Sequence, residues 1–196
     1  MLNLLTLWIP KVILRGENVY LRIPRRTDHH QWTKLRRESK EFLQPWEPTW
    51  PPDALSRRAF RKRLRQFTEN WKAGHSYSFF IISKKDECLT GGVTLSNIRR
   101  GVIQAATIGY WIGYPFAQKG YMSEAVSLTL DFAFDELGLH RIEAACLLHN
   151  EPSRNLLLKL GFTEEGIARQ YLHINGQWQD HRMFGILRSD KQHNAQ

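Results

Sequence analysis

Residues 109 to 162 constrain the fold more than any other part of the chain. The segment runs from the extended stretch GYWIGYP through the turn AQKG into an amphipathic helix, and it ends in the short helical pattern NEPSRNLLLKLGF. The first N–H groups of a helix have no partners within the helix, and that end carries a partial positive charge. The turn therefore predicts an anion site, although a lone glycine before a helix is also typical of a plain turn.

Hydrophobic periodicity predicts the other elements. Strand-like patterns occur at residues 19–23, 77–83, 89–98 and 102–112, in RIEAACLL, and in two extended segments about the INGQ turn, which suits a hairpin. Helical patterns run from Thr27 or Asp28 to Arg36, from Asp53 to Lys72, from Met122 to Leu137, and from Pro152 to the stop at Gly161. This order predicts a mixed α/β (α+β) fold, with a central, twisted, mostly antiparallel mixed sheet of about seven strands flanked by helices.

The length of 196 residues predicts one domain over residues 1–187, followed by a flexible polar tail at 188–196. No apolar run approaches the ~18 uncharged residues that a membrane span needs. The apolar start MLNLLTLWIPKVILRG lacks the basic region and cleavage pattern of a signal peptide. Cys88 and Cys146 lie in apolar runs without a second Cys or His at ligand spacing, which predicts buried reduced thiols, no metal and a cytoplasmic location.

The net charge of +9 predicts a negatively charged partner or ligand, because a basic surface concentrates anions. The predicted helix between Asp53 and Lys72 carries much of this charge. Its basic residues are Arg57, Arg58, Arg61, Lys62, Arg63 and Arg65. Such a helix is usually a solvated face, and the alternative is contact with RNA or the ribosome, since clustered cations bind phosphates without reading sequence.

The stretch FLQPWEPTWPPD, residues 42–53, holds four prolines and two tryptophans. Prolines fix much of the backbone, while the tryptophans provide large aromatic faces. Two interpretations stay open for this stretch. It is either a rigid connection between helices with its tryptophans in the core, or one wall of a substrate cleft in which Glu47 is the only acid before Asp53.

A second polar segment, from Asn150 to Asn155, offers an amide, a hydroxyl, a guanidinium and another amide where a strand ends and a helix begins. By itself, this segment is explained by N-capping through Asn150 with Arg154 on the surface. Its position after the turn at 117–123 is what makes it a candidate part of the same site.

The turn before a helix, the N-x-x-S segment and the following LGF resemble, in that order, the GNAT superfamily of acetyl-CoA-dependent N-acetyltransferases. A closer resemblance is to the ribosomal-protein-alanine N-acetyltransferases of the Rim group. It rests on LQPWEP, IGYWIGYPFAQKGYMSEA, HRIEA, LGFTEEG and the closing INGQWQDH. The match covers nearly the whole chain and implies a GNAT-like fold with acetyl-CoA as cofactor.

The resemblance also implies a set of cofactor-binding residues. Backbone groups of Tyr110, Trp111 and Ile112 would pair with the pantetheine arm as an added strand does. The pyrophosphate would bind at Ala117, Gln118, Lys119, Gly120, Tyr121, Met122 and Ser123. Near the thioester, Asn150, Ser153 and Asn155 would bind the cofactor, with Arg154 or Lys119 reaching a phosphate.

The sequence departs from the family pattern at several of these positions. Ala117 stands where many members have Gln or Arg, Gln118 where Gly is common, and Met122 where the pattern has Gly or Ala. The tyrosine that many members carry in the last short helix as general acid is missing from LLLKLGF, and Ser153 is its proposed substitute.

Acid–base requirements favour a protein N-terminus as the acceptor. An α-amine has a pKa near ~8 against ~10.4 for lysine, a difference worth ~3.3 kcal/mol of deprotonation at neutral pH. An α-amine therefore needs little base catalysis. The candidate bases are Glu47, Glu143 and, less favoured, Asp180, although Glu143 has Arg141 nearby as a salt-bridge partner.

The Rim resemblance and the basic surface together favour a ribosome-associated protein N-terminus as substrate. Two alternatives stay open. One is acetylation of a small amine such as a polyamine or an aminoglycoside, although a basic protein attracts such cations poorly. The other is a basic RNA-binding module without catalysis, and the sequence leaves open whether the chain is a monomer or a dimer.

Overall fold

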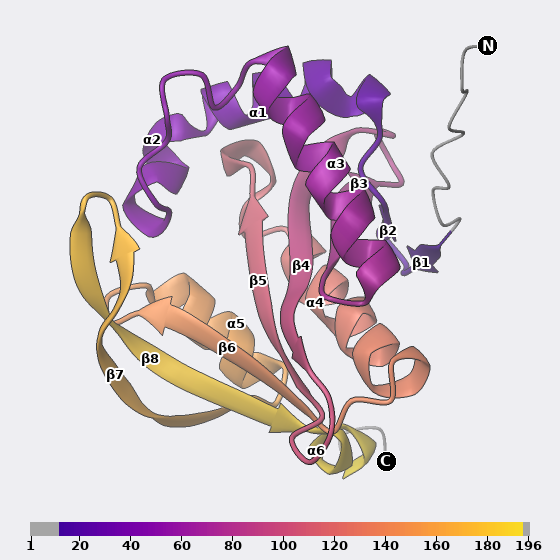
Figure 1. The fold of residues 1–196 in the computed structure, drawn as a ribbon, viewed down its shortest axis with the longest axis vertical. Helices are drawn as coiled ribbons and strands as arrows, with labels where there is room; N and C mark the ends of the chain where they lie inside the picture. Colours follow the sequence, from indigo (N-terminus) through magenta and orange to yellow (C-terminus); the bar gives the residue numbers. More distant parts are fainter. Residues whose placement is uncertain (1–11, 194–196) are drawn as a thin grey trace.

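The computed structural model describes residues 12–193, which form one eight-stranded sheet with helices on both faces (Figure 1). The strand order is β1-β2-β3-β4-β5-β6-β8-β7. The strands are β1 (Ile13–Arg15), β2 (Val19–Arg22), β3 (Tyr77–Ser83), β4 (Leu89–Arg99), β5 (Ala105–Ile112), β6 (Arg141–Leu147), β7 (Thr163–Ile174) and β8 (Gln177–Leu187). The predicted mixed fold is confirmed, and β1 is the strand that the sequence did not reveal, because three residues are too few to show an alternating pattern.

All neighbouring strands are antiparallel except β5 and β6, which are parallel. Their pairing covers only Ala105–Thr107 against Arg141–Glu143. Beyond that level β5 continues to Ile112 and β6 to Leu147, and the two strands diverge in space (Figure 1). The sheet therefore contains a gap between two central strands.

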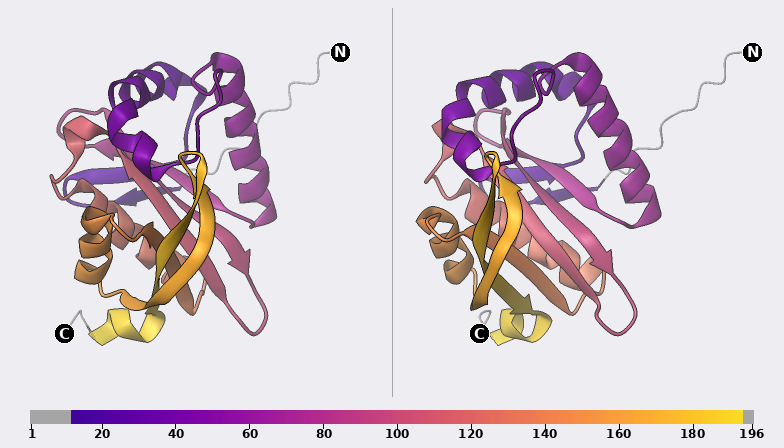
Figure 2. Two further views of the ribbon diagram at one scale, coloured as in Figure 1. Left: turned by 90° about the vertical axis from the view of Figure 1, so that its left-hand side faces the viewer. Right: turned by 60° about the vertical axis from the view of Figure 1, so that its left-hand side comes forward.

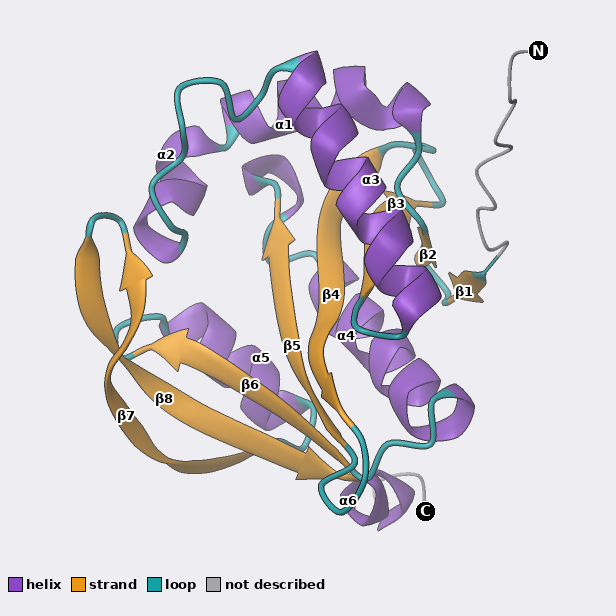
Figure 3. Ribbon diagram, viewed as in Figure 1, coloured by secondary structure: helices purple, strands orange, loops and turns teal. Residues whose placement is uncertain are grey.

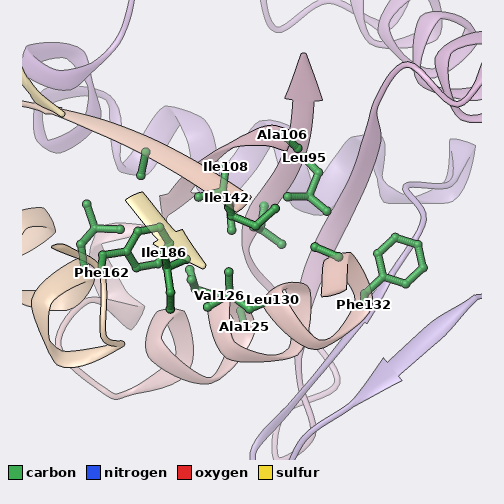
Figure 4. Close-up of a cluster of buried hydrophobic side chains, with 14 of the residues drawn as sticks. Leu95, Ala106, Ile108, Ala125, Val126, Leu130, Phe132, Ile142, Phe162 and Ile186 are labelled. Atoms are coloured by element: carbon green, nitrogen blue, oxygen red, sulfur yellow. The ribbon is translucent and has the colours of Figure 1, made fainter. Parts of the chain in front are cut away.

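Helices α4 (Tyr121–Asp131) and α5 (Glu151–Lys159) cover one face of the sheet. Figure 3 shows α4 connecting β5 to β6, as a parallel pair requires. The larger core lies beneath this face, and Figure 4 shows Val126 and Leu130 of α4 beside Ile108, Ile142 and Ile186 of the sheet. The apolar side chains predicted for this helix thus form its buried side.

The opposite face carries α1 (His29–Glu38) and α3 (Arg57–Ala73), with the short α2 (Lys40–Leu43) and the 3-10 turns η1 (Arg26–Asp28) and η2 (Gln44–Trp46). Alternate residues of a strand point to opposite faces. Phe79 and Ile81 accordingly join the larger core, while Phe80 and Ile82 join a smaller one with Trp32 of α1 and Phe60 of α3.

Several boundaries differ from the sequence predictions. The helix predicted to end at Leu137 does so, but α4 passes into a π-helical turn, η4 (Phe132–Glu136). Asp28 does not cap α1 with its side chain, because its carboxylate accepts hydrogen bonds from Arg22, at 2.7 and 2.8 Å, and from the Arg25 N–H at 2.6 Å. Of the two predicted buried thiols, Cys146 is buried and Cys88 is only half-buried.

The predicted flexible tail begins instead with a helix, α6 (Arg188–His193). The Arg188 N–H donates to the His140 carbonyl at 2.9 Å, and Lys191 forms an ion pair with Asp131 of α4. The apolar start of the chain, residues 1–11, lies outside the described residues. Within residues 12–193, no helix is both long enough and apolar enough to cross a membrane.

Candidate functional site

The gap between β5 and β6 leaves backbone groups of β5 without a strand partner. The Gly113 N–H donates to the Thr90 carbonyl of the neighbouring chain segment at 2.8 Å. In an antiparallel pair alternate residues bond to the same neighbour, so Trp111 directs its backbone toward β4. Tyr110 and Ile112 direct theirs toward the gap, which leaves two of the three predicted residues able to pair with an extended ligand.

The centre of the sheet is uncovered at the level of the gap. Gly109 of β5 is exposed, and a Cβ built on it would meet nothing within 4 Å. A mostly antiparallel sheet can leave part of one face open to solvent. The exposed position therefore marks where a second substrate can approach the gap from the face opposite α4 and α5.

Tyr110 and Ser153 meet at the gap from the other face. The Tyr110 hydroxyl and the Ser153 Oγ lie 2.8 Å apart, and burial raises the pKa of the Tyr110 phenol. Burial also raises the pKa of the neighbouring Cys146 thiol to about 11. Both groups therefore stay protonated at neutral pH, and they place hydrogen-bond donors beside the predicted thioester position.

Asn150 fixes the helix that carries Ser153. Its side-chain Oδ1 accepts a hydrogen bond from the Ser153 N–H at 3.2 Å, which makes Asn150 the N-cap of α5. The structure thus brings together Asn150, Ser153 and Tyr110, which the sequence placed in two separate segments. The hydroxyl of Tyr110 was missed, because only its backbone was assigned a role.

The start of α4 has the geometry of an anion site. Gly120 is its N-cap with a φ of 81°, and the first helical hydrogen bond runs from the Glu124 N–H to the Gly120 carbonyl. The three preceding N–H groups, from Tyr121 to Ser123, have no side-chain cap among the described residues. Such a helix start binds phosphate through these groups and the helix dipole.

The turn before α4 explains one departure from the family pattern. Gln118 has a φ of 59°, a left-handed conformation that glycine adopts without strain. The chain therefore keeps the backbone shape at the position where Gly is common, with Gln in its place. Lys119 lies with its Nζ 5.7 Å from the centre of the Phe116 ring, while Met122 packs against the larger core.

A pocket of about 410 Å³ adjoins this turn between α4, the end of α5 and the turn before β2. Its lining includes Gly120, Ser123, Ser127 and Lys159, so it adds a cation and two hydroxyls to the anion site. Lys159 was not predicted, because it is close to α4 only in the folded chain. Among the acids in the lining, Glu124 accepts a hydrogen bond from the Asn18 N–H at 2.9 Å.

Glu47, the predicted base in the proline-rich stretch, is held by three donors. Its carboxylate accepts from Arg36 Nη1 at 2.7 Å, from Arg36 Nη2 at 2.5 Å and from Trp50 Nε1 at 2.7 Å. The Arg36 guanidinium lies 4.2 Å from the Trp50 ring centre and 4.9 Å from that of Trp111. We call these four residues the Arg36 clamp.

The Arg36 clamp joins segments that are distant in sequence. Arg36 belongs to α1 and Trp111 to β5, while the Glu47 carbonyl accepts from the Asn175 N–H at 3.0 Å at the tip of the β7–β8 hairpin (Figure 2). Trp46 packs against His149 at 5.3 Å between ring centres, and both tryptophans of the stretch are half-buried. This placement favours the wall interpretation over the core interpretation.

The other predicted acids are also occupied. Glu143 forms ion pairs with Arg99 and with Arg141, the latter at 3.2 Å. Asp180 accepts from the Gln170 N–H at 2.8 Å. None of the three carboxylates is therefore an unengaged base.

Two further predicted residues lie on the outer part of α5. Arg154 donates to Glu164 at 3.1 Å, which engages it away from the anion site, and Asn155 is exposed. Lys119 and Lys159 are therefore the better-placed cations. Across residues 12–193 there is no group of three or more His, Cys, Asp or Glu side chains that could hold a metal ion.

Comparison with known proteins agrees with this geometry. The acetyltransferase (GNAT) domain model matches residues 18–163. The probable N-acetyltransferase YjcK of Bacillus subtilis (strain 168) is 38% identical over 91% of this chain and 98% of its own length. The ribosomal protein uS5-alanine N-acetyltransferase of Escherichia coli (strain K12) is 32% identical over 93% of this chain and 94% of its own.

Solved structures show the same relationship. The ribosomal-protein-S5-alanine acetyltransferase of Vibrio fischeri has a TM-score of 0.85 and 32% identity, covering 92% of this chain and 98% of that one. Mycobacterium smegmatis RimJ, solved in complex with CoA-disulfide, has a TM-score of 0.84 and 30% identity, covering 91% of this chain and 85% of that one. The resemblance inferred from the motifs is thereby confirmed, and the chain belongs to the GNAT family of N-acetyltransferases, with ribosomal-protein-alanine N-acetyltransferases among its relatives.

Proposed function

We propose that the protein transfers an acetyl group from acetyl-CoA to the N-terminal α-amine of a protein, with a ribosomal protein as the favoured acceptor. The observation that carries the proposal is the gap between β5 and β6, with the Tyr110–Ser153 hydrogen bond on one face and the exposed Gly109 on the other. A ligand in this gap can be reached by a second substrate without moving the sheet.

The residues present fit acetyl-CoA. Tyr110 and Ile112 would pair with the amides of the pantetheine arm, as an added strand does. The N–H groups at the start of α4 and the side chains of Lys119 and Lys159 would hold the phosphates. Acetyl-CoA supplies an acetyl thioester, whose carbonyl carbon a neutral amine attacks as the carbon–sulfur bond breaks.

Tyr110 and Ser153 would act on the departing sulfur. Because burial raises the pKa of Tyr110, its hydroxyl remains protonated and a donor at neutral pH. The pair can therefore donate a hydrogen bond to the sulfur as negative charge develops on it. Donors aimed at developing charge in a dry site are among the larger contributions to catalysis.

The amine would lose its proton to solvent. Glu47, Glu143 and Asp180 all hold other donors, so none accepts a proton without breaking an existing contact. With a pKa near ~8, about a tenth of an α-amine is already neutral at pH 7, against under ~0.1% of a lysine amine. We therefore propose that Glu47 orients the wall of the site and that the site selects α-amines over lysines.

The test is acetylation of peptides. We expect the protein to acetylate a peptide with the free N-terminal alanine of ribosomal protein uS5, and to leave unmodified the same peptide with a blocked N-terminus and an internal lysine. Mass spectrometry locates the acetyl group, and polyamines and aminoglycosides complete the panel. Turnover of the small amines alone would contradict the proposed acceptor, and turnover of none would contradict the reaction.

The role of Tyr110 has a matched control. Tyr110→Phe removes one donor and is expected to lower kcat by about 100-fold with little change in the affinity for CoA. Tyr114→Phe removes an exposed hydroxyl four residues away and should leave kcat unchanged. Equal kcat values in the two variants would show that the Tyr110 hydroxyl takes no part in the reaction.

The alternatives weighed on the sequence gain no support. Membership of an N-acetyltransferase family argues against a basic module without catalysis. The polyamine and aminoglycoside alternative requires an acidic site, whereas the charges of Glu47 and Glu143 are compensated by arginines.

A further inference from the structure

We propose that a basic pocket between η1 and the start of α3 binds RNA through its phosphodiester backbone. The pocket has a volume of about 210 Å³ and is lined by Arg26, Thr27, His29, Arg57, Phe60 and Arg61. We call these six residues the basic notch. The proposal concerns a site separate from the gap between β5 and β6, and only its choice of RNA as the polyanion draws on the proposed ribosomal acceptor.

The basic notch is built on a rigid floor. Phe60 is only 2% exposed and packs with its ring centre 5.0 Å from that of Trp32 and 5.3 Å from that of His29. The His29 ring is fixed further by contacts of its Nε2 with the Leu55 carbonyl and with Thr33. The floor of the notch is therefore part of the smaller core, and it fixes the backbone positions from which the arginines extend.

The cations of the notch are not neutralised. Arg26, Arg57 and Arg61 are exposed, and none of them forms an ion pair with an acid in residues 12–193. The nearest acid in the sequence, Asp28, is bound by the Arg22 guanidinium at 2.7 Å and by the Arg25 N–H. Three guanidinium groups and a histidine therefore converge on one pocket without a compensating negative charge.

Phosphate is the ligand that this chemistry fits. A guanidinium is planar and donates two parallel hydrogen bonds to phosphate oxygens, which makes arginine the usual residue for phosphate recognition. The pocket is large enough for one phosphate group and its first ester oxygens. One phosphate in the notch would thus contact side chains from both η1 and α3.

The surroundings favour a polyanion over a single phosphate. Arg58, Lys62 and Arg65 are exposed on α3 and extend the positive surface beyond the notch. A helix of 17 residues is about 25 Å long, so it spans several consecutive phosphates. Phe60 is buried and cannot stack on a base, so binding would depend on the backbone and not on base sequence.

The same surface does not suit a lipid bilayer. Membrane-surface helices carry exposed apolar residues that insert between the lipids. None of the large hydrophobic side chains exposed in the described part of the chain belongs to η1 or α3. Charge without apolar anchors favours RNA, which is also the polyanion that surrounds a ribosomal protein.

The test compares two double variants with the same loss of charge. Binding of a fluorescent 16-base-pair RNA duplex is measured by anisotropy between 50 and 200 mM salt. The pair Arg26→Ala and Arg61→Ala removes two cations of the notch, and Arg58→Ala and Arg65→Ala removes two cations of α3 outside it. We expect the notch variant to lose about tenfold in affinity and about two units of salt slope, and the control variant, whose cations only extend the surface along α3, to lose less of both.

Three results would overturn the proposal. They are wild-type affinity in the notch variant, equal losses in both variants, and tighter binding to vesicles of acidic phospholipid than to RNA. Both variants should acetylate the uS5 peptide at the wild-type rate, since neither change touches the gap. Failure of RNA binding with intact acetylation, or the reverse, therefore separates this proposal from the proposed reaction.

Discussion

At the scale of single residues, Asn150 has two roles that can be separated. Its Oδ1 caps α5 through the Ser153 N–H, and its Nδ2 has no hydrogen-bond partner among the described residues. The cap stabilises the helix, whereas the amide nitrogen is available to donate to a bound cofactor. One side chain thus contributes both to the fold and to the proposed site.

Two substitutions of Asn150 distinguish these roles. Asn150→Ala removes both groups, and we expect the free energy of unfolding to fall by about 1 kcal/mol and the affinity for CoA to fall as well. Asn150→Asp keeps the capping oxygen but lacks the N–H donor, so it should retain stability and still bind CoA weakly. Urea unfolding and calorimetric titration measure the two quantities, and full CoA affinity in both variants would exclude Asn150 from the site.

At the residue scale, local structure was predictable where its signal lies in the neighbouring residues. The capping sequence of Asn150 and the glycine before α4 indicate their own roles, since both act through the backbone next to them. The Tyr110 hydroxyl and Lys159 gave no such signal. Each lies at the candidate site only because β5 and α5 pack against other elements, and no local pattern records that packing.

At the scale of elements, the Arg36 clamp holds α1, the proline-rich stretch and β5 together. The side chains of Arg36 and Glu47 are 9% and 19% exposed, so the ion pair is largely removed from water. Two largely buried charges stabilise the fold only as a pair, because removing either one leaves the other buried without an opposite charge. The clamp therefore determines where the wall of the site stands relative to the end of β5.

Breaking the Arg36–Glu47 ion pair of the Arg36 clamp should lower the free energy of unfolding. Arg36→Met leaves the Glu47 carboxylate without its cation, and we expect a loss of about 3 kcal/mol in the free energy of unfolding. Lys34→Met, on the same helix, breaks only a solvent-exposed contact with Glu38 at 4.0 Å and should cost under about 0.5 kcal/mol. Adding Glu47→Gln to Arg36→Met should restore part of the stability in urea unfolding, and an unchanged double variant would show that the loss comes from packing instead.

The elements and the β7–β8 hairpin were largely predictable, and the contacts between distant segments were not. The short apolar runs of β3 to β5, the alternation in β6 and the period of α3 and α4 identify strand and helix, because each pattern lies within one segment. The contact between the hairpin tip at Asn175 and the stretch at Glu47 joins residues 128 positions apart. Neither segment has a sequence pattern that predicts contact with the other.

At the scale of the whole molecule, arginine–carboxylate networks connect the last third of the chain. Glu164 on β7 accepts from Arg182 of β8 at 2.8 Å and from Arg154 of α5 at 3.1 Å. These hydrogen bonds lower the pKa of Glu164, and those from Arg141 lower the pKa of Glu165. A carboxylate whose pKa is lower in the folded than in the unfolded chain stabilises the fold only while it is ionised.

The pH dependence of stability follows from the lowered pKa values of Glu164 and Glu165. The stabilisation is complete above the ordinary carboxylate pKa of 4.5 and is lost as the pH falls through the lower folded values. We expect the urea midpoint to be constant from pH 7 to about pH 5 and then to fall. Glu164→Gln should make the acid slope shallower, whereas Glu38→Gln, at an exposed site, should not, and identical slopes in all three proteins would contradict the assignment.

The gap between β5 and β6 also bears on self-association. Unpaired backbone at a strand edge is a template on which another polypeptide can add a strand, which is the first step of many aggregates. Here such an edge lies within the sheet instead of at its rim. A guest strand needs a spacing of about 4.8 Å from one neighbour only, so the divergence of β6 leaves room for it beside Tyr110 and Ile112 of β5. An extended ligand bound along this edge would therefore also keep foreign strands away from it.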